Sequence, residues 1–236
     1  MWRARSASSS SVPAVGHYVA RMRTYQTILF DLDGTLIDSV DLIVDSYLHT
    51  IAVHDLPAVT RQEILAGMGR PLRSIFGAWT SDPATMERWI ATYREYNLDN
   101  HDSRVTAYPG VVDMVRQIRA AGYRTALVTS KNRYGAERGL SLVGLMESIE
   151  LIVGADDVTH PKPHAEPVEQ ALARLGMPTA GCLFVGDSHH DVYSGRAAGV
   201  ETVGVTWGPF DRTHLEESAP DFYCSAPADL LALLEL

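Results

Sequence analysis

Lysine is scarce in this sequence of 236 residues, which contains 18 arginines but only two lysines, Lys131 and Lys162. The 20 basic side chains are outnumbered by 29 acidic ones, and the formal net charge is −9 at pH 7. Binding nucleic acid without regard to its sequence needs concentrated positive charge, so this balance argues against a nucleic-acid partner. The net charge does not exclude small anionic substrates, because a local site can carry positive charge in a chain that is acidic as a whole.

Cysteine and long apolar runs are also rare. Cys182 and Cys224 are too few for a disulfide framework and have no metal-ligand spacing. No apolar run approaches the roughly 18–20 residues that a membrane-spanning helix needs. We therefore expect a soluble, cytoplasmic protein with no membrane partner. The length suits one or two domains with a sizeable buried core.

Residues 1–22 differ in composition from the rest of the chain. They contain three arginines and no acid, with five serines among the first eleven positions, and the first acidic residue is Asp31. Transit peptides share this composition. We favour a disordered tail, or an upstream start codon with Met22 as the true beginning, and we leave the segment out of the fold prediction.

After this segment the sequence alternates between short apolar runs and helical patterns. The helical patterns, such as 165–175 and 191–198, are followed by glycine. This alternation predicts an α/β fold with a Rossmann-like, doubly wound parallel sheet that helices cover on both faces. Ligands bind such sheets at the carboxyl ends of the strands. The predicted strands are 26–31, 123–129, 149–153, 182–187 and 202–205.

One segment, residues 41–104, has no convincing strand pattern. Its position directly after the first strand predicts an α-helical cap inserted into a core made of residues 23–40 and 105–236. A cap over the ligand-binding edge of the sheet would exclude water from the chemistry there. The amphipathic helical patterns within the cap are 41–53, 61–67, 72–79 and 85–98.

Polar side chains follow the predicted strands, where a parallel sheet brings the loops together. Alternation along the chain points Asp31 and Asp33 the same way. A cluster of carboxylates is costly unless a cation neutralises it, and oxygen-only ligands suggest Mg²⁺. Lysine and threonine side chains can hold phosphate oxygens. Phosphoryl transfer to an aspartate follows as a hypothesis, although the pattern alone does not identify which aspartate attacks. The loops carry the residues 31–35, 129–131, 156–163 and 187–191.

Four motifs in this order resemble the haloacid dehalogenase-like (HAD) superfamily: DLDGT at 31–35, LVTS at 127–130, Lys162-Pro163, and VGDSHHD at 185–191. The resemblance extends from Thr24 to Leu236, and the helical insertion is similar to the small α-helical cap of that superfamily. Within it, the chain looks most like phosphoglycolate phosphatases and bacterial pyrophosphatases. The stretches at 93–102, 155–167 and 185–191 resemble the pyrophosphatase branch in particular.

The resemblance implies roles for the motif residues. Asp31 would be the nucleophile and Asp33 the general acid and base, a use of the second aspartate that separates phosphatases from dehalogenases. The Asp31 carboxylate, the Asp33 main-chain carbonyl and Asp187 would hold Mg²⁺. The predicted phosphate-binding residues are Gly34, Thr35, Thr129, Ser130 and Lys162, and Asp191 and Lys131 are predicted to support the site.

Other polar residues have more than one interpretation. Arg70 and Arg73, between two cap helices, would contact the far end of the substrate, or else are surface arginines. His189 and His190 invite a metal-ligand interpretation, but neighbouring helical residues point about 100° apart. Residues 101 and 102 are candidates for substrate contacts or a hinge, and Asp38 for the hinge. The predicted cap interior contains Trp79, Trp89 and Tyr93.

Together these observations predict a Mg²⁺-dependent phosphatase that acts on a small phosphorylated molecule through an aspartyl-phosphate. Pyrophosphate and 2-phosphoglycolate are both open as substrates, because the selective cap side chains are not fixed by the sequence. Two alternatives are a phosphomutase on the same core and a non-enzymatic phospho-aspartate switch. The oligomeric state is not predicted, since no coiled-coil pattern is present.

Overall fold

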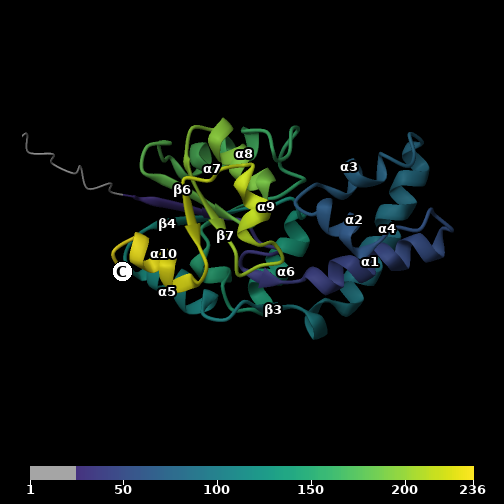
Figure 1. The fold of residues 1–236 in the computed structure, drawn as a ribbon, viewed down its shortest axis with the longest axis horizontal. Helices are drawn as coiled ribbons and strands as arrows, with labels where there is room; N and C mark the ends of the chain where they lie inside the picture. The colour runs from purple at the N-terminus through teal and green to yellow at the C-terminus, as the bar shows by residue number, and fades with distance from the viewer. Residues whose placement is uncertain (1–24) are drawn as a thin grey trace, which may run out of the picture.

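The computed structural model describes residues 25–236, so the predicted N-terminal tail lies outside the described residues. A parallel sheet of six strands forms the centre of the molecule, in the order β5-β4-β1-β6-β7-β8 (Figure 1). This confirms the predicted doubly wound α/β fold. The strands are β1 (Thr27–Phe30), β4 (Arg124–Val128), β5 (Leu151–Val153), β6 (Cys182–Gly186), β7 (Glu201–Val205) and β8 (Phe222–Cys224).

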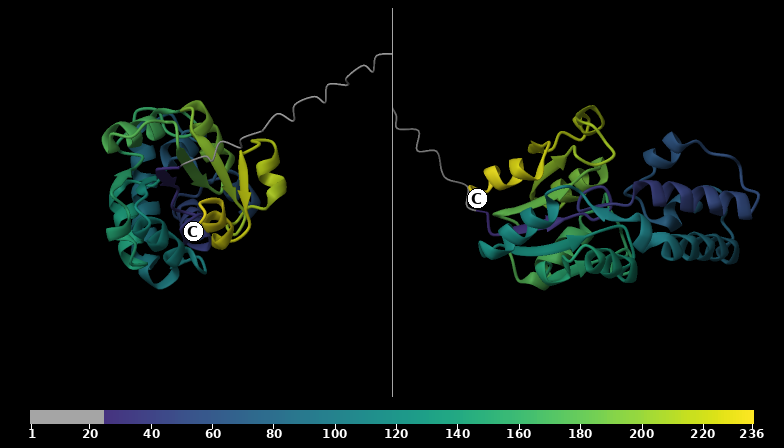
Figure 2. Two further views of the ribbon diagram at one scale, coloured as in Figure 1. Left: turned by 90° about the vertical axis from the view of Figure 1, so that its left-hand side faces the viewer. Right: turned by 90° about the horizontal axis from the view of Figure 1, so that it is seen from below.

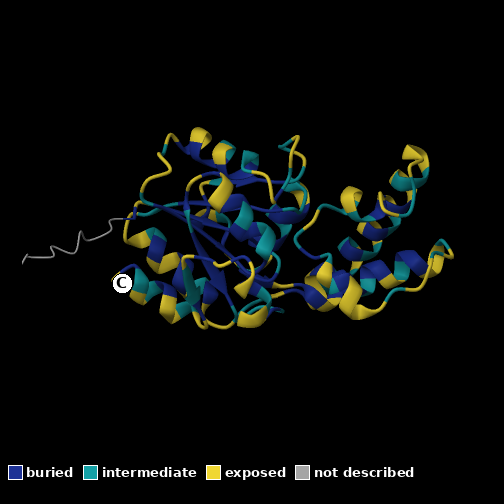
Figure 3. Cartoon of the chain, turned by 45° about the horizontal axis from the view of Figure 1, so that its top comes forward, coloured by how far each residue is buried: buried dark blue, intermediate teal, exposed yellow. Residues whose placement is uncertain are grey.

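Strand β1 lies at the centre of this sheet and is buried on both faces. Ile28 and Phe30 belong to one apolar cluster, and Leu29 belongs to the cluster on the opposite face. A strand covered on both faces reads as a continuous apolar run, as TILF does here. Figure 3 shows the strands as buried and the outer faces of the helices as exposed. The chain builds β4 and β5 on one side of β1 and β6 to β8 on the other, which makes β1 the topological switch point.

Helices pack on both faces of the sheet. The cluster around Phe30 includes side chains of α5 (Val111–Ala120), α6 (Arg133–Leu142) and α10 (Pro227–Leu233). The opposite face is covered by α7 (Glu166–Leu175) and α8 (His189–Ala197). Two short elements complete this part of the chain, the 3₁₀ helix η1 (Met146–Ser148) and α9 (Arg212–Glu216).

The helical insertion lies between two short antiparallel strands, β2 (Ile37–Asp38) and β3 (Thr106–Ala107). Its helices stand apart from the sheet at one end of the molecule (Figure 2). They are α1 (Val40–Val53), α2 (Arg61–Ala66), α3 (Leu72–Phe76) and α4 (Pro83–Arg104). None of the helices in the described part of the chain has the length and apolar character needed to span a membrane.

Aromatic side chains form the interior of the insertion. The Phe76 ring is fully buried, and its centroid lies 5.6 Å from that of Tyr47 and 6.0 Å from that of Trp89. Tyr93 and Trp79 pack on the same ring, at 6.5 Å and 5.8 Å. The predicted interior position is therefore confirmed for Trp89 and Tyr93, whereas Trp79 is partly buried and packs at the edge of this cluster.

Several elements are longer or shorter than the sequence pattern predicts. Helix α4 begins at Pro83, because the Asp82 side chain accepts a hydrogen bond from the Thr85 N–H and proline suits the first helical position. It also extends to Arg104, six residues beyond the predicted end at 98, through a polar segment with no apolar periodicity. The two-residue strands β2 and β3 are too short to show any periodicity, and the sequence pattern did not predict them.

Candidate active site

Asp31 directly follows β1, so it lies at the switch point of the sheet and at the carboxyl ends of the neighbouring strands. The same geometry brings Thr129 from the end of β4 and Asp187 from the end of β6 to this edge. All three side chains are buried, with exposed fractions of 5% or less. The prediction that the loops after the strands meet is therefore confirmed.

Lys162 reaches this edge from the loop before α7 and contacts two carboxylates. Its Nζ lies 2.8 Å from Asp31 Oδ1 and 2.6 Å from Asp191 Oδ1. A third hydrogen bond, of 3.3 Å, goes to the Val128 carbonyl oxygen. Burial lowers the pKa of the Lys162 ammonium, but the two carboxylates outweigh burial and raise that pKa above its ordinary value. Lys162 is therefore a fixed, buried positive charge on Asp31.

The acidic side chains here exceed the positive charge that faces them. Oxygen atoms of Asp31, Asp187 and Asp191 lie within 4.8 Å of one another, with Lys162 as the ammonium among them. Without a cation, burial raises the pKa of the Asp31 carboxyl to about 7, an effect that Lys162 opposes and Asp191 reinforces. Burial, Asp191 and Asp31 raise the pKa of Asp187 well above its ordinary value. This buried, oxygen-only set fits a hard divalent cation such as Mg²⁺.

Asp191 and Asp187 differ in how many of their carboxylate oxygens accept hydrogen bonds. Both oxygens of Asp191 are engaged: Oδ1 accepts from Lys162, and Oδ2 accepts from the Ser188 hydroxyl at 2.6 Å and the Ser188 N–H at 3.1 Å. The bond from the Ser188 N–H and the reciprocal bond from the Asp191 N–H to the Ser188 hydroxyl oxygen, at 3.4 Å, form the capping box that begins α8. Asp187 Oδ1 accepts a hydrogen bond from the Thr35 hydroxyl at 3.2 Å, and no side chain among residues 25–236 donates to its Oδ2, which leaves that oxygen for a cation. Ser188 was not among the predicted site residues.

Asp33 has a different set of partners. Its carboxylate accepts hydrogen bonds from the Ser39 hydroxyl at 2.6 Å and from Lys131 Nζ at 2.9 and 3.1 Å. Burial raises the pKa of Asp33, but Lys131 and these hydrogen bonds outweigh burial and lower the pKa below its ordinary value. The structure therefore places Lys131 on the predicted acid/base residue. The sequence did not predict Ser39 as a partner of Asp33, because a serine before a helix is typical of a helix N-cap.

Gly34 and Thr35, predicted to bind phosphate, lie against Asp187. Gly34 has φ +90°, and a Cβ at this position would come within 2.2 Å of Asp187 Oδ2. Only glycine combines this backbone conformation with so close an approach. Thr35 is fully buried, its hydroxyl donates to Asp187, and its carbonyl oxygen accepts from Trp207 Nε1 at 2.9 Å. The two residues thus position the acidic cluster.

A cavity of about 660 Å³ opens between this edge of the sheet and the helical insertion. The core supplies Asp31, Asp33 and residues 129–131 to its lining. The insertion touches the core beside it, since the Ser130 hydroxyl donates to the Gly69 carbonyl oxygen at 2.6 Å. The insertion lines the cavity with Tyr47, Tyr93, Asn97, Arg70 and Arg73, among others.

The two predicted arginines differ in their partners. Arg73 forms an ion pair with Glu87 of α4, so its charge is compensated. The Arg70 guanidinium instead donates to the Ser74 hydroxyl at 2.8 Å, and no ion pair to a carboxylate joins it within residues 25–236. Arg70 is therefore the cation of this pair that is available to an anion in the cavity.

The histidines that were considered for the site lie beside it. His189 Nδ1 is 3.3 Å from His214 Nε2, and the His190 ring packs beneath Gly69, where a Cβ would be 3.1 Å from it. Neither belongs to a metal-capable cluster among the described side chains. His101 is buried at the core end of α4, and its neighbour Asp102 pairs with Arg138 of α6. The hinge interpretation of these two residues fits this contact between insertion and core.

Comparisons with known proteins agree with this geometry. The family model of the haloacid dehalogenase-like hydrolases matches residues 28–205. The chain is 43% identical over 208 residues to the pyrophosphatase PpaX of Anoxybacillus flavithermus, covering 88% of this chain and 96% of that protein. A haloacid dehalogenase-like family hydrolase from Streptococcus pneumoniae is 25% identical, with a TM-score of 0.76 over 88% of this chain and 97% of that one.

A predicted phosphoglycolate phosphatase from Haemophilus somnus shares the fold, with a TM-score of 0.79 and 24% identity over 90% of this chain and 99% of that one. The match of the family model spans most of the chain, from within β1 to the end of β7. The chain therefore belongs to the haloacid dehalogenase-like hydrolase family.

Proposed function

We propose that this hydrolase is a Mg²⁺-dependent phosphatase that cleaves inorganic pyrophosphate through an aspartyl-phosphate on Asp31. The observation that carries the proposal is the position of Asp31, which lines the cavity while Lys162 holds its Oδ1. Asp31 Oδ2 accepts no hydrogen bond from the described residues, which leaves it free to attack phosphorus. A carboxylate fixed in this way loses little freedom on reaching the transition state.

The reaction has two halves on this set of residues. Asp31 attacks the phosphorus of one phosphoryl group, the bond to the bridging oxygen breaks, and the second phosphate departs. Asp33 is ionised in the free enzyme, so a proton that it gives to the departing oxygen must enter with the substrate. Asp33 then takes a proton from the water that hydrolyses the acyl phosphate and restores Asp31. The Thr129 hydroxyl binds an oxygen of the transferred group, and Lys162 neutralises the charge of that group from its position beside Asp31. The Ser130 hydroxyl donates to the Gly69 carbonyl oxygen, so it can bind phosphate only when this contact with the insertion opens. Asp31, Asp187 and the Asp33 carbonyl would hold a divalent cation, which would neutralise charge on these anions.

Two observations favour pyrophosphate over a monoester. The relative from Anoxybacillus flavithermus is named a pyrophosphatase and matches 88% of the chain. Arg70 places an uncompensated cation on the insertion side of the cavity that Asp31 also lines, where it could bind the second phosphate of pyrophosphate. The carboxylate of 2-phosphoglycolate carries less charge toward that cation, so this substrate is the second candidate.

A panel of substrates tests the proposal. Phosphate release is measured under steady-state conditions for pyrophosphate, 2-phosphoglycolate and 4-nitrophenyl phosphate, each with Mg²⁺ and with EDTA. We expect repeated turnover with Mg²⁺ and the highest kcat/KM for pyrophosphate. A single stoichiometric burst would indicate a phospho-aspartate switch, and isomerised sugar phosphate without free phosphate would indicate a mutase. A higher kcat/KM for 2-phosphoglycolate would overturn the choice of pyrophosphate.

Exchange of Asp187 for asparagine should separate metal binding from folding. The introduced amide keeps an acceptor for the Thr35 hydroxyl but removes one charge from the buried cluster, so the EDTA-treated variant should melt above the EDTA-treated wild type. A gain of about 1 kcal/mol raises Tm by about 2–4 °C in a domain of this size. Mg²⁺ should raise the Tm of the wild type but not that of the variant. Thermal unfolding scans measure both shifts.

The matched control for Asp187→Asn is Asp41→Asn. The Asp41 carboxylate is exposed and pairs with Arg61 on the insertion. This variant should keep the Mg²⁺-dependent shift of the wild type. If Asp187→Asn also kept the full shift, Asp187 would not be a metal ligand.

Truncation of Arg70 to alanine should act mainly on substrates with a second anionic group. A hydrogen bond to a charged group is worth about 1.5–3 kcal/mol, so KM for pyrophosphate should rise about tenfold or more. KM for 4-nitrophenyl phosphate, which has no second anion, should change little. Arg73→Ala is the control, because Glu87 already compensates that charge. Equal effects of Arg70→Ala on both substrates would remove Arg70 from the proposed distal subsite.

A further inference from the structure

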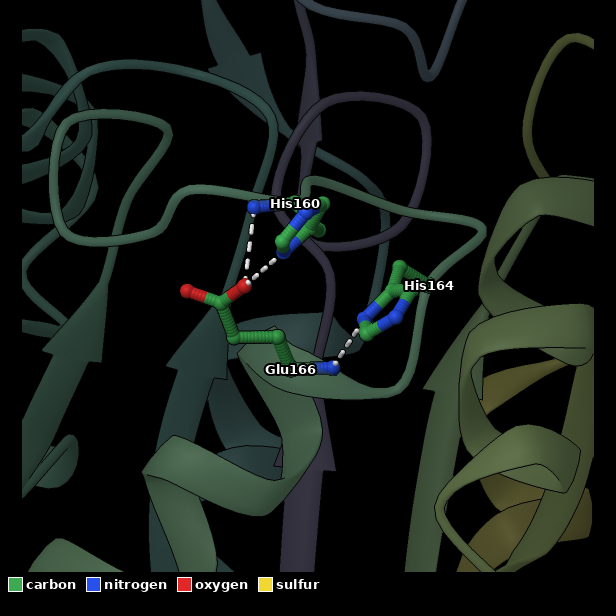
Figure 4. Close-up of side chains that lie close together, drawn as sticks. All are labelled: His160, His164 and Glu166. Atoms are coloured by element: carbon green, nitrogen blue, oxygen red, sulfur yellow. Dashed lines mark hydrogen bonds and ion pairs between the residues drawn. The ribbon is translucent and has the colours of Figure 1, made fainter.

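A second metal-capable cluster lies outside the candidate active site, at the loop that carries Lys162. It consists of His160, His164 and Glu166, and the candidate ligand atoms of the three side chains lie within 4.8 Å of one another (Figure 4). Both histidines are exposed and Glu166 is half-buried. In the sequence of the loop, His160-Pro161-Lys162-Pro163-His164, the two histidines come two positions before and two positions after the buried lysine.

Glu166 is held in place as an anion before any ligand binds. Its Oε1 accepts from the Thr159 N–H at 2.7 Å, and its Oε2 accepts from the His160 N–H at 2.8 Å. These two backbone hydrogen bonds lower the pKa of the Glu166 carboxyl below its ordinary value. The chain therefore fixes one ionised oxygen ligand at the start of α7.

The two imidazoles lie next to this carboxylate. His160 Nδ1 is 2.8 Å from Glu166 Oε2, so a proton is shared between a nitrogen and an oxygen that are both good ligands for a metal ion. The His164 ring packs near that of His160, with 4.8 Å between their centroids, and His164 Nδ1 accepts from the Glu166 N–H at 3.1 Å. A metal ion would replace the shared proton of His160 and require a small turn of the exposed His164 ring.

We propose that His160, His164 and Glu166 bind a divalent transition-metal ion such as Zn²⁺, separately from the Mg²⁺ of the active site. Two imidazoles and a carboxylate are a ligand set for Zn²⁺ and its neighbours in the transition series, whereas Mg²⁺ prefers oxygen ligands alone. A shallow pocket lined by the two histidines, Pro163 and Glu169 leaves space for a water or a further ligand to complete the coordination.

A metal ion at this site would also affect the loop that carries Lys162. An ion bound by both histidines closes a ring around Lys162, whose Nζ holds Asp31 and Asp191. The ion would therefore restrain the segment that presents the buried ammonium. Because the ligand binds the folded chain, occupancy should also raise the Tm. This proposal does not depend on which phosphate compound the enzyme cleaves.

The test is a titration of the full chain, without an affinity tag and in saturating Mg²⁺, with Zn²⁺ by calorimetry and with Co²⁺ by visible absorption. We expect stoichiometric binding of the transition metal and a Zn²⁺-dependent rise in Tm. His164→Asn and Glu166→Gln should each weaken binding at least about tenfold and remove the rise in Tm. His49→Asn is the control, because His49 stacks on Tyr96 in the insertion, away from this loop.

Two results would overturn the proposal. One is Zn²⁺ affinity that stays at the wild-type value in both His164→Asn and Glu166→Gln. The other is loss of the binding in Asp187→Asn or His189→Asn, which would place the ion in the active site or between His189 and His214. Circular dichroism of each variant in EDTA establishes that the fold is intact.

Discussion

The Asp31→Asn variant is expected to lose at least about 10³-fold in kcat on every phosphorylated substrate, while it keeps the wild-type fold. Loss of an attacking nucleophile costs enzymes of this kind most of their rate enhancement. Asparagine has nearly the shape of aspartate, and its amide oxygen can still accept the hydrogen bond from Lys162 Nζ. The substitution also removes one of three crowded carboxylates, so the free energy of unfolding should not fall in the absence of Mg²⁺.

The variant distinguishes attack by Asp31 from attack by a water molecule. If water attacked phosphorus directly, the variant would still have Asp33 and Lys131 in place, and a measurable fraction of turnover would survive. Mass spectrometry of acid-quenched wild-type enzyme should show the mass of one added phosphoryl group, and the variant should not. Asp156→Asn is the matched control, because Asp156 lines the same cavity but lies outside the acidic cluster. Wild-type turnover by Asp31→Asn, with contaminating phosphatase excluded, would refute the proposed mechanism.

Much of the fold follows from local sequence patterns. The buried strands β1, β4 and β6 are continuous apolar runs that end at polar residues, and the structure contains each of them within one or two residues of the predicted bounds. The parallel topology then brings Asp31, Thr129 and Asp187 to one edge without any further information. The weaker predictions concern elements without periodicity, such as β2, β3 and the polar last turns of α4.

The site shows where sequence patterns stop being informative. Motif order indicates Asp31 and Lys162, but the pairing of Lys131 with Asp33 depends on the path of the loop between β4 and α6. The same holds for the difference between Arg70 and Arg73, because the ion pair of Arg73 comes from Glu87, on a different helix. The cluster of His160, His164 and Glu166 was not predicted from the sequence. Its carboxylate is positioned by backbone hydrogen bonds that a sequence does not display.

Lysine is scarce in this chain, so exchanging Lys162 for arginine tests whether the buried site requires lysine. Lys162→Arg should lower kcat at least about a hundredfold, in the range seen when one donor to a transition-state charge is lost. The Lys162 side chain is 1% exposed and lies between two carboxylates, with Nζ 5.7 Å from the centre of the Phe184 ring. A guanidinium is larger and planar, so it cannot occupy the position of a compact ammonium without displacing its neighbours. Forcing extra atoms into such a packed site costs about 1–3 kcal/mol, and Tm should fall as well.

Lys131→Arg is the matched control, since it makes the same exchange at the only other lysine of the chain. The Lys131 side chain is 14% exposed and lines the cavity, where a longer side chain has room to keep its ion pair with Asp33. Its kcat should stay within about tenfold of the wild type, because the charge beside Asp33 is retained.

The Lys162→Met variant leaves Asp31 and Asp191 without a cation, so it should lower the free energy of unfolding of the metal-free protein by about 3–5 kcal/mol. If Lys162→Arg turned over pyrophosphate at the wild-type rate, the buried site would tolerate a guanidinium, and the retention of lysine there would have no basis in the chemistry of the site.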